Sequence, residues 1–218
     1  MTKNHSYIAA FDLDKTILSV NSSRLVVKMS RKLGLITKRN YRKAIFYSFA
    51  YKFDLQDANE IVLSMMQWLK GLKEEVIKDL AGKYIVPEVK NMVRPEMIEA
   101  VNYHYRNNAR VILLSSALPY LCDPIAELLG MDDVVCSRLE TRDGCFTGRS
   151  VGRLVFGPEK AVRMKAYCNS HNFPSDTAWY YGDAYADRYV LESIGHAVCV
   201  KPEIKLRWLA KKKGWKII

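Results

Sequence analysis

Two aspartates stand directly after a short apolar run near the start of the chain. The run Tyr7-Ile8-Ala9-Ala10 predicts a buried strand, because it is short, continuously apolar and soon followed by polar residues. Asp12 and Asp14 lie at the carboxyl end of this predicted strand. A buried carboxylate without a partner is strongly unfavourable. These two acids therefore need a metal ion, a partner or a chemical role.

Strands and helices are predicted to alternate along the chain. Alternation of this kind is typical of an α/β fold, a Rossmann-like parallel sheet with helices on both faces. The first two predicted strands are separated by residues 12–110, a stretch far longer than one crossover helix needs. We therefore expect an inserted domain and a return helix between them. The predicted strands are Tyr7 to Phe11, Val111 to Leu114, Trp179 to Tyr181 and Ala197 to Val200.

The insertion is predicted to be a helical cap domain of residues 21–91, added to a catalytic core formed by residues 1–20 and 92–218. Ser22 and Ser23 are expected to cap the start of its first helix, and Gly34 to end it. Further helices are predicted at 44–51, 61–69 and 76–84. We interpret the aromatic run 44–51 as the core of a helical bundle, with contact to lipid as the alternative.

A second small unit is predicted after the insertion. Pro95 favours the start of the return helix. Further along, the segments Val135 to Arg142 and Cys145 to Val151 flank the dipeptide Asp143-Gly144, which suits a tight hairpin turn. A small β-hairpin flap is expected there.

The chain carries a net charge of +11, which is unevenly distributed. Residues 15–53 contain ten Lys or Arg and no acid, and residues 201–218 contain seven bases and one acid. No nucleic-acid motif accompanies these bases, so a solvated basic face is favoured over nucleic-acid binding. A phosphorylated small substrate, or an anionic surface, would be attracted by the same charge.

Cysteine and hydropathy patterns exclude several classes of protein. The five cysteines are odd in number and form no CxxC, which argues against a disulfide framework and a zinc site. No apolar run is long enough for a transmembrane segment, and the amino terminus lacks the apolar core of a signal peptide. We therefore expect a cytoplasmic protein. The histidines form no metal-binding pair and are interpreted as surface residues: His5, His104, His171 and His196.

Polar residues follow the later predicted strands as well. Ser115 and Ser116 end the second strand, and Asp183 and Asp187 follow the third. Lys160 begins a helix after Gly-Pro-Glu. Because ligands bind outside the carboxyl ends of the strands in an open parallel sheet, these residues are expected to form one active site.

Taken in chain order, these motifs resemble those of the haloacid dehalogenase superfamily. They are DxDxT after the first strand, Ser after the second, Lys before a helix, and GDxxxD after a later strand. The helical insertion after the first motif, the flap and the closing Gly214-Trp215 resemble subfamily IB, the group around phosphoserine phosphatase. The resemblance covers the whole chain and implies a phosphatase.

The resemblance also implies roles for the catalytic residues. Asp12 would attack phosphorus and form an aspartyl phosphate, which water then hydrolyses. Asp14 would protonate the leaving oxygen and then deprotonate the water, a residue that separates phosphatases from dehalogenases in this superfamily. Ser115 and Lys160 would hold the phosphoryl oxygens, and Asp187 would orient Lys160.

Mg²⁺ is the cofactor that the resemblance implies. Asp12 and Asp183 would bind it through their carboxylates, and Asp14 would add its backbone carbonyl. A hard divalent cation offsets the repulsion of such crowded acids. The residues expected to bind the substrate or its phosphate are Thr16, Asn21, Met65, Ser115, Ser116 and Lys160.

Two positions argue against phosphoserine as the substrate. Relatives that cleave phosphoserine carry a Glu for the ammonium group where this chain has Asn21, and a cap Arg for the carboxylate where it has Met65. Both differences remove a charge. The predicted substrate is another phosphomonoester, such as an alcohol phosphate or a phospholipid-like molecule. Lys15 stands where many relatives have Gly, so the turn lacks the freedom that Gly provides.

Three alternatives to a small-molecule phosphatase remain open from the sequence. A phosphotransferase or mutase would use the same aspartyl phosphate. A phosphatase could act on a lipid phosphate at a membrane surface. A binding protein could keep the fold and contact an anionic surface through the basic segments, although the intact acid set disfavours it.

Overall fold

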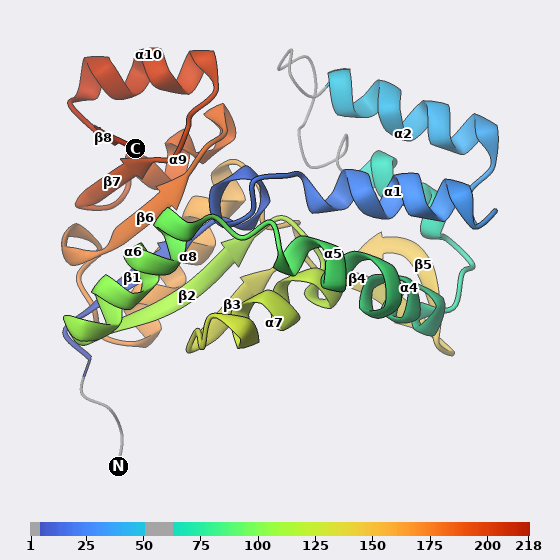
Figure 1. The fold of residues 1–218 in the computed structure, drawn as a ribbon, viewed down its shortest axis with the longest axis horizontal. Helices are drawn as coiled ribbons and strands as arrows, with labels where there is room; N and C mark the ends of the chain where they lie inside the picture. The colour runs from blue at the N-terminus through green and yellow to red at the C-terminus, as the bar shows by residue number, and fades with distance from the viewer. Residues whose placement is uncertain (1–4, 51–62) are drawn as a thin grey trace.

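The computed structural model describes residues 5–50 and 63–218, and its centre is a six-stranded sheet. The strand order is β3-β2-β1-β6-β7-β8, and each neighbouring pair is parallel. Figure 1 shows the sheet as a twisted layer between helices. The strands are β1 (Tyr7–Phe11), β2 (Ala109–Ser115), β3 (Asp133–Cys136), β6 (Trp179–Gly182), β7 (His196–Cys199) and β8 (Lys216–Ile217).

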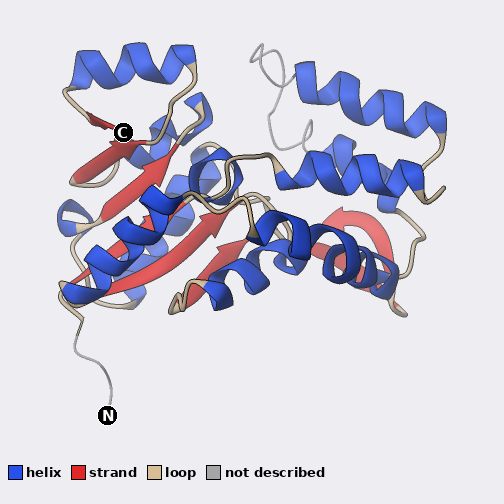
Figure 2. Cartoon of the chain, viewed as in Figure 1, coloured by secondary structure: helices blue, strands red, loops and turns tan. Residues whose placement is uncertain are grey.

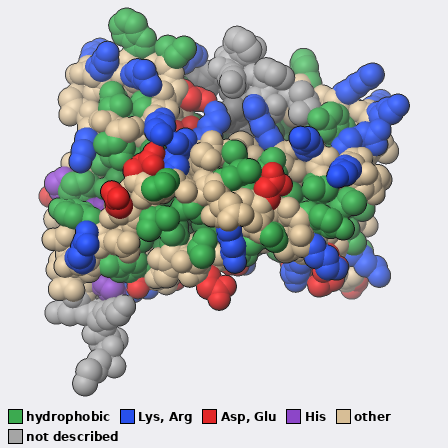
Figure 3. All heavy atoms as spheres, in the orientation of Figure 1, with side chains coloured by type: hydrophobic (Ala, Val, Ile, Leu, Met, Phe, Trp, Pro, Cys, Tyr) green, Lys and Arg blue, Asp and Glu red, His purple; other side chains and the backbone are tan. Residues whose placement is uncertain are grey.

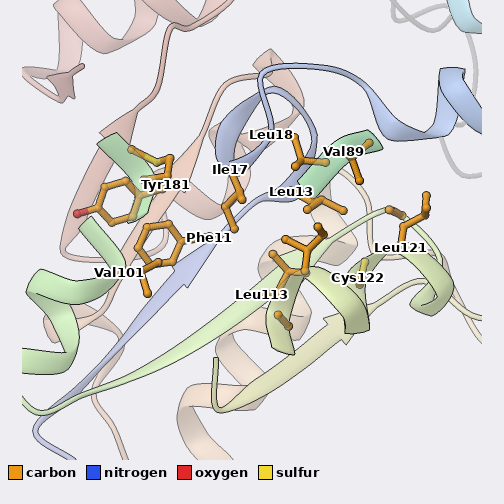
Figure 4. Close-up of a cluster of buried hydrophobic side chains, with 14 of the residues drawn as sticks. Phe11, Leu13, Ile17, Leu18, Val89, Val101, Leu113, Leu121, Cys122 and Tyr181 are labelled. Carbon is orange, nitrogen blue, oxygen red and sulfur yellow. The ribbon is translucent and has the colours of Figure 1, made fainter. Parts of the chain in front are cut away.

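The two faces of the sheet bury alternate residues, as the period of a strand requires. On β1, Ala9 and Phe11 join one hydrophobic cluster, whereas Ile8 and Ala10 join another. Figure 4 shows Phe11 of the first cluster beside Tyr181 and Val101. The predicted Rossmann-like core is confirmed. The first face is covered by α6 (Pro95–Arg106) and α7 (Pro119–Leu128), and the second by α8 (Pro158–Ser170), α9 (Arg188–Leu191) and α10 (Ile204–Lys213).

A helical segment lies between β1 and α6, beyond the carboxyl edge of the sheet (Figures 1 and 2). Its later helices are tied to the core, because Leu80, Ile85 and Val89 belong to the same buried cluster as Phe11. The described elements of this segment are α1 (Ser22–Lys32), α2 (Lys38–Ala50), η3 (Gln67–Leu69), α4 (Glu74–Leu80), η4 (Ala81–Ile85) and α5 (Val86–Lys90).

The start of α1 differs from the prediction. Asn21, not Ser22 or Ser23, caps this helix, and its side-chain oxygen accepts a hydrogen bond of 2.9 Å from the Arg24 amide. Asn caps helices as well as Ser does, so the helix begins one residue earlier. Ser22 then lies inside the first turn. At the other end, Gly34 adopts a positive φ of 74°, as expected for a residue that ends a helix.

The aromatic run of α2 is only partly described. Ala44 is buried, but Phe46 is 67% exposed, so the prediction that this run is bundle core is wrong for Phe46. Residues two positions apart on a helix point in different directions, which explains the contrast. The side chains of 45 and 47–51 lie outside the description, as do residues 61–62 of the next predicted helix. Residues 63–66 are helical and lead into η3.

The segment predicted as the first flap strand is divided between two sheets. Residues Asp133–Cys136 form β3, which pairs with β2 and places Cys136 opposite Ser115. The flap itself consists of β4 (Leu139–Arg142) and β5 (Cys145–Ser150), which pair antiparallel. Its turn is the predicted one: Asp143 and Gly144 have positive φ values of 50° and 74°, as a tight two-residue turn requires.

The prediction for His104 is wrong, and the strand β8 was not predicted. His104 is fully buried rather than on the surface, and its ring nitrogens lie 2.9 Å from the hydroxyls of Tyr7 and Tyr181. The short strand β8 follows Gly214, which ends α10 in the left-handed conformation. β8 was not predicted, because two exposed residues carry no strand pattern.

The basic residues of the amino-terminal region lie largely on the surface. Figure 3 shows lysine and arginine side chains over the part of the face where α1 and α2 lie in Figure 1. A solvated basic face agrees with this distribution. Among the described residues, we find no helix long and apolar enough to cross a bilayer.

Candidate active site

Three aspartates meet at the carboxyl edge of the sheet. Asp12 follows β1, and Asp183 and Asp187 follow β6, which pairs with β1 so that Phe11 lies opposite Tyr181. One carboxylate oxygen from each aspartate lies within 4.8 Å of those of the other two. All three residues are buried. The structure therefore brings together the acids that the sequence placed at this edge.

Lys160 provides a positive charge inside this cluster. It lies in the first turn of α8, is 4% exposed, and its Nζ is 2.7 Å from Asp12 Oδ1 and 2.8 Å from Asp187 Oδ1. The attraction of the two carboxylates raises the pKa of Lys160 even though burial opposes this. The lysine is therefore charged at neutral pH.

One lysine does not neutralise three carboxylates. Burial raises the pKa of Asp12 to about 7, against the opposing effect of Lys160. Burial, followed by repulsion from Asp187 and Asp12, raises the pKa of Asp183 to about 9. Carboxyl pKa values this high indicate excess negative charge in a poorly solvated place.

A divalent metal ion fits this arrangement. Clustered carboxylate oxygens are the ligands that Mg²⁺ prefers, and a cation would relieve the repulsion that raises both pKa values. Asp187 is the least available of the three, because Oδ1 accepts from Lys160 and Tyr180 and Oδ2 from the Ala184 amide. Asp12 and Asp183 are thus the carboxylates best placed to bind a cation, as predicted for them.

The carboxylate of Asp14 lies outside the cluster. Its Oδ1 accepts hydrogen bonds from the backbone amide of Ser22 at 2.8 Å and from the Ser22 hydroxyl at 2.6 Å. This side chain therefore connects the turn after β1 to the first turn of α1. Asp14 was predicted to bind the metal through its backbone carbonyl. This role does not require its carboxylate to lie in the cluster.

The turn after β1 contains Lys15 and the predicted site residue Thr16. Lys15 adopts a positive φ of 58°, so this position has the conformation that Gly adopts most easily. Its Nζ lies 3.8 Å from Glu203 Oε1. Thr16 is buried, and its hydroxyl donates to Asp183 Oδ1 at 3.4 Å. Thr16 thus touches the acid cluster rather than lining the space above it.

The two serines after β2 have different surroundings. Ser115 is buried, and its Oγ accepts a hydrogen bond of 3.2 Å from the Ala117 amide. Ser116 instead lines the cavity above the acids. Contact of Ser115 with a phosphoryl group remains a prediction.

The sequence did not predict that Tyr180 holds Asp187, nor that Gly182 packs closely against it. The Tyr180 hydroxyl donates to Asp187 Oδ1 at 2.7 Å, and the Tyr180 ring lies 5.3 Å from Lys160 Nζ. A Cβ on Gly182 would lie 2.8 Å from Asp187 Oδ2, closer than such atoms approach. The glycine next to Asp183 was a signal for this tight packing, whereas Tyr180 looked like an ordinary strand residue.

A cavity of ≈ 260 Å³ opens above the acid cluster. Asp12, Lys160 and Asp183 line one part of it, and the predicted substrate residues Asn21 and Met65 line another. The site therefore combines a charged floor with space for a ligand between the sheet and the helical segment.

Residues 9–192 match the profile of the haloacid dehalogenase-like hydrolase family. That range includes the acid pair, Lys160 and GDxxxD. The chain belongs to this family. The predicted family is confirmed, and the protein is an enzyme of the hydrolase class.

Several curated members of the family are similar over nearly the whole chain. A protein of Streptomyces azureus named for inhibition of morphological differentiation is 28% identical over 99% of this chain and 80% of its own length. A phosphoserine phosphatase of Mycobacterium tuberculosis is 31% identical over 96% and 69%. A histidinol-phosphatase of Neisseria meningitidis is 23% identical over 97% of both chains. The names of the last two proteins support the predicted phosphatase.

Several solved structures share the fold. A protein of unknown function from Bordetella pertussis superposes with a TM-score of 0.86 at 20% identity and covers 99% of both chains. A phosphoserine phosphatase with an analogue of its phospho-aspartyl intermediate gives a TM-score of 0.73 at 16% identity, over 98% of this chain and 93% of its own. At these identities the likeness concerns the fold.

Proposed function

We propose that this protein is a Mg²⁺-dependent phosphomonoester hydrolase that works through an aspartyl phosphate on Asp12. The observation that carries the proposal is the buried pairing of Asp12 with Lys160, beside Asp183 and at the floor of the cavity. Residues 1–20 and 92–218 would form the catalytic core and 21–91 its cap. The substrate would be a small phosphorylated molecule.

In the first step, a carboxylate oxygen of Asp12 would attack phosphorus. The new O–P bond forms as the ester P–O bond breaks, and the leaving oxygen takes a proton from Asp14. Burial raises the pKa of Asp14, which favours the protonated acid that this step needs. Lys160 would fix the position of Asp12 and attract the phosphoryl oxygens.

In the second step, water would attack the aspartyl phosphate. Asp14, now a carboxylate, would accept the proton from the water, and inorganic phosphate and free Asp12 would result. Asp12 and Asp183, with the Asp14 carbonyl, would hold Mg²⁺, whose charge offsets that of the phosphoryl group. Asp187 would keep Lys160 in place through their 2.8 Å contact.

A substrate other than phosphoserine is supported by the cavity lining. Asn21 and Met65 stand where a phosphoserine phosphatase would need charged partners, and both line the cavity without a charge. Asn21 is also engaged, because its side-chain oxygen caps α1. A zwitterionic amino acid would therefore lack the two counter-charges that these two positions would provide.

The test is hydrolysis of a panel of phosphomonoesters with Mg²⁺, comparing the wild type with Asp12→Asn and with an exposed aspartate changed in the same way, Asp143→Asn. We expect release of inorganic phosphate by the wild type and by Asp143→Asn. Asp12→Asn should lose activity by several orders of magnitude, as when a catalytic nucleophile is removed. Addition of EDTA should abolish turnover.

Three results would contradict the proposal. They are normal turnover by Asp12→Asn, turnover unaffected by the chelator, and phosphoserine as the best substrate of the panel. Transfer of the phosphoryl group to an acceptor, without net release of phosphate, would indicate a phosphotransferase or mutase with the same first step.

A further inference from the structure

The helical segment contributes a largely apolar lining to the cavity. Of the twelve lining residues that the described part of 21–81 provides, nine are apolar and Arg24 is the one with a charge. Arg24 is exposed. The nine apolar residues, which we call the apolar chamber, are Val26, Val27, Ala44, Met65, Met66, Trp68, Leu69, Ile77 and Ala81.

The sheet side of the cavity continues the apolar surface. Leu118, Leu121 and Phe156 also line it. Tyr120 also lines it, and its hydroxyl donates to Glu74 at 2.8 Å. The polar end of this tyrosine is therefore already satisfied by the protein, and its ring adds to the apolar wall.

The chamber is supported by the flap. Leu69 and Ile77 pack with Phe146 of β5 in one buried cluster. Backbone hydrogen bonds join the two parts, from the Gly71 amide to the Phe146 carbonyl at 2.9 Å and from the Glu74 amide to the Gly144 carbonyl at 2.8 Å. These contacts connect the apolar wall to the flap.

We infer that the chamber binds a hydrocarbon chain of the substrate, with the phosphate group at Asp12 and Lys160. This inference rests on the proposed function and names its substrate class: phosphate monoesters of apolar alcohols. The physical reason is that transfer of an apolar chain from water to an apolar surface lowers the free energy, whereas a charged or strongly polar alcohol would find few partners among the nine residues of the chamber.

The test is a series of linear alkyl phosphates from methyl to octyl, each used as a dissolved monomer. Each methylene that enters the chamber should raise kcat/KM by about two- to fourfold, up to the length at which the chamber is full. Phosphoserine should be a poorer substrate than butyl phosphate. A kcat/KM that is independent of chain length would overturn the inference.

A charge placed in the chamber should weaken the dependence of kcat/KM on the length of the alkyl chain. The ratio of kcat/KM for octyl phosphate to that for methyl phosphate should fall by at least about tenfold in Met65→Arg, because an arginine in the chamber disfavours the chain. The matched control is Val162→Arg, at a 58% exposed position of α8, which should keep the wild-type ratio. An unchanged ratio in Met65→Arg would contradict the chamber's role.

The series also separates this inference from the proposed function. If methyl phosphate is hydrolysed in an Asp12-dependent way but chain length has no effect, only the inference fails. If no ester is hydrolysed, the proposed function fails. A parallel assay with dodecyl phosphate in phosphatidylcholine vesicles distinguishes a membrane-borne substrate from a dissolved one. Turnover higher than that of dissolved octyl phosphate supports a membrane-borne substrate. Lower turnover supports a dissolved substrate.

Discussion

At the scale of single residues, the site depends on how Asp187 is held. Both of its carboxylate oxygens accept hydrogen bonds, from Lys160 and Tyr180 on one side and from the Ala184 amide on the other. Asp187 therefore has a fixed orientation, and Lys160 is fixed by it. The buried charges of Asp187 and Lys160 thus both have hydrogen-bond partners, which is the condition under which buried charges are tolerated.

Gly182→Ala tests this arrangement. The added Cβ would lie 2.8 Å from Asp187 Oδ2, so the carboxylate must move and Lys160 must follow. We expect kcat/KM for phosphate release to fall by about 10²-fold, the effect of a displacement near 1 Å at a catalytic group. Gly82→Ala is the matched control, because nothing lies within 4 Å of its added Cβ. Equal activity of the two variants would show that Asp187 does not position the site.

Residue types and their spacing predicted most of the site, but not its side-chain directions. Asp12, Lys160, Asp183 and Asp187 could be placed together, because the carboxyl ends of parallel strands meet at one edge. The hydrogen bonds of Asp14 to Ser22 could not be predicted, since they depend on where α1 begins. Because Asn21 caps α1, this helix begins one residue earlier than predicted.

At the scale of secondary-structure elements, α6 is held against the sheet through a buried histidine. The ring of His104 lies between the hydroxyls of Tyr7 on β1 and Tyr181 on β6. Burial, and to a smaller extent His196, lowers the pKa of His104 to about 4. The imidazole is therefore neutral in the folded protein at neutral pH and accepts a proton more readily when the chain unfolds.

This helix contact predicts a pH dependence of stability. Above pH 6.5 the histidine is neutral in both the folded and the unfolded state, and its contribution to the free energy of unfolding is fully present. As the pH falls from 6.5 towards 4, the unfolded state takes up a proton that the folded state resists. The free energy of unfolding of the wild type, measured against that of His104→Gln, should then fall by up to about 1.4 kcal/mol per pH unit. If the free energies of unfolding of the two proteins change in parallel with pH, burial does not lower the pKa of His104 as described.

Elements with strong local patterns were predicted, and those that depend on partners were not. The apolar run of β1 and the Asp143-Gly144 turn determine their structures locally. β3 was assigned to the flap, because four half-buried residues have the same pattern in a hairpin and at the edge of a parallel sheet. Pairing with β2, which the sequence does not encode locally, decides between these two sheets.

At the scale of the whole molecule, the enzyme combines an acidic floor from the core with an apolar lining from the helical segment. The family and the sheet could be predicted, because the motifs extend over the chain in order. The cavity could not, since it requires α1, η3 and α4 to be placed over the sheet edge and tied to the flap. In this account, the core provides the chemistry and the helical segment selects the substrate.

The account's central claim, that Asp12 carries the phosphoryl group during turnover, is tested most directly by trapping the phosphoenzyme. The enzyme should be mixed with Mg²⁺ and butyl phosphate, quenched in acid during turnover, and digested for peptide mass spectrometry. We predict a phosphoryl group on Asp12 in the wild type and in Asp143→Asn, and none in Asp12→Asn. Turnover without a phosphorylated Asp12, or phosphate on another residue of the active enzyme, would contradict the account.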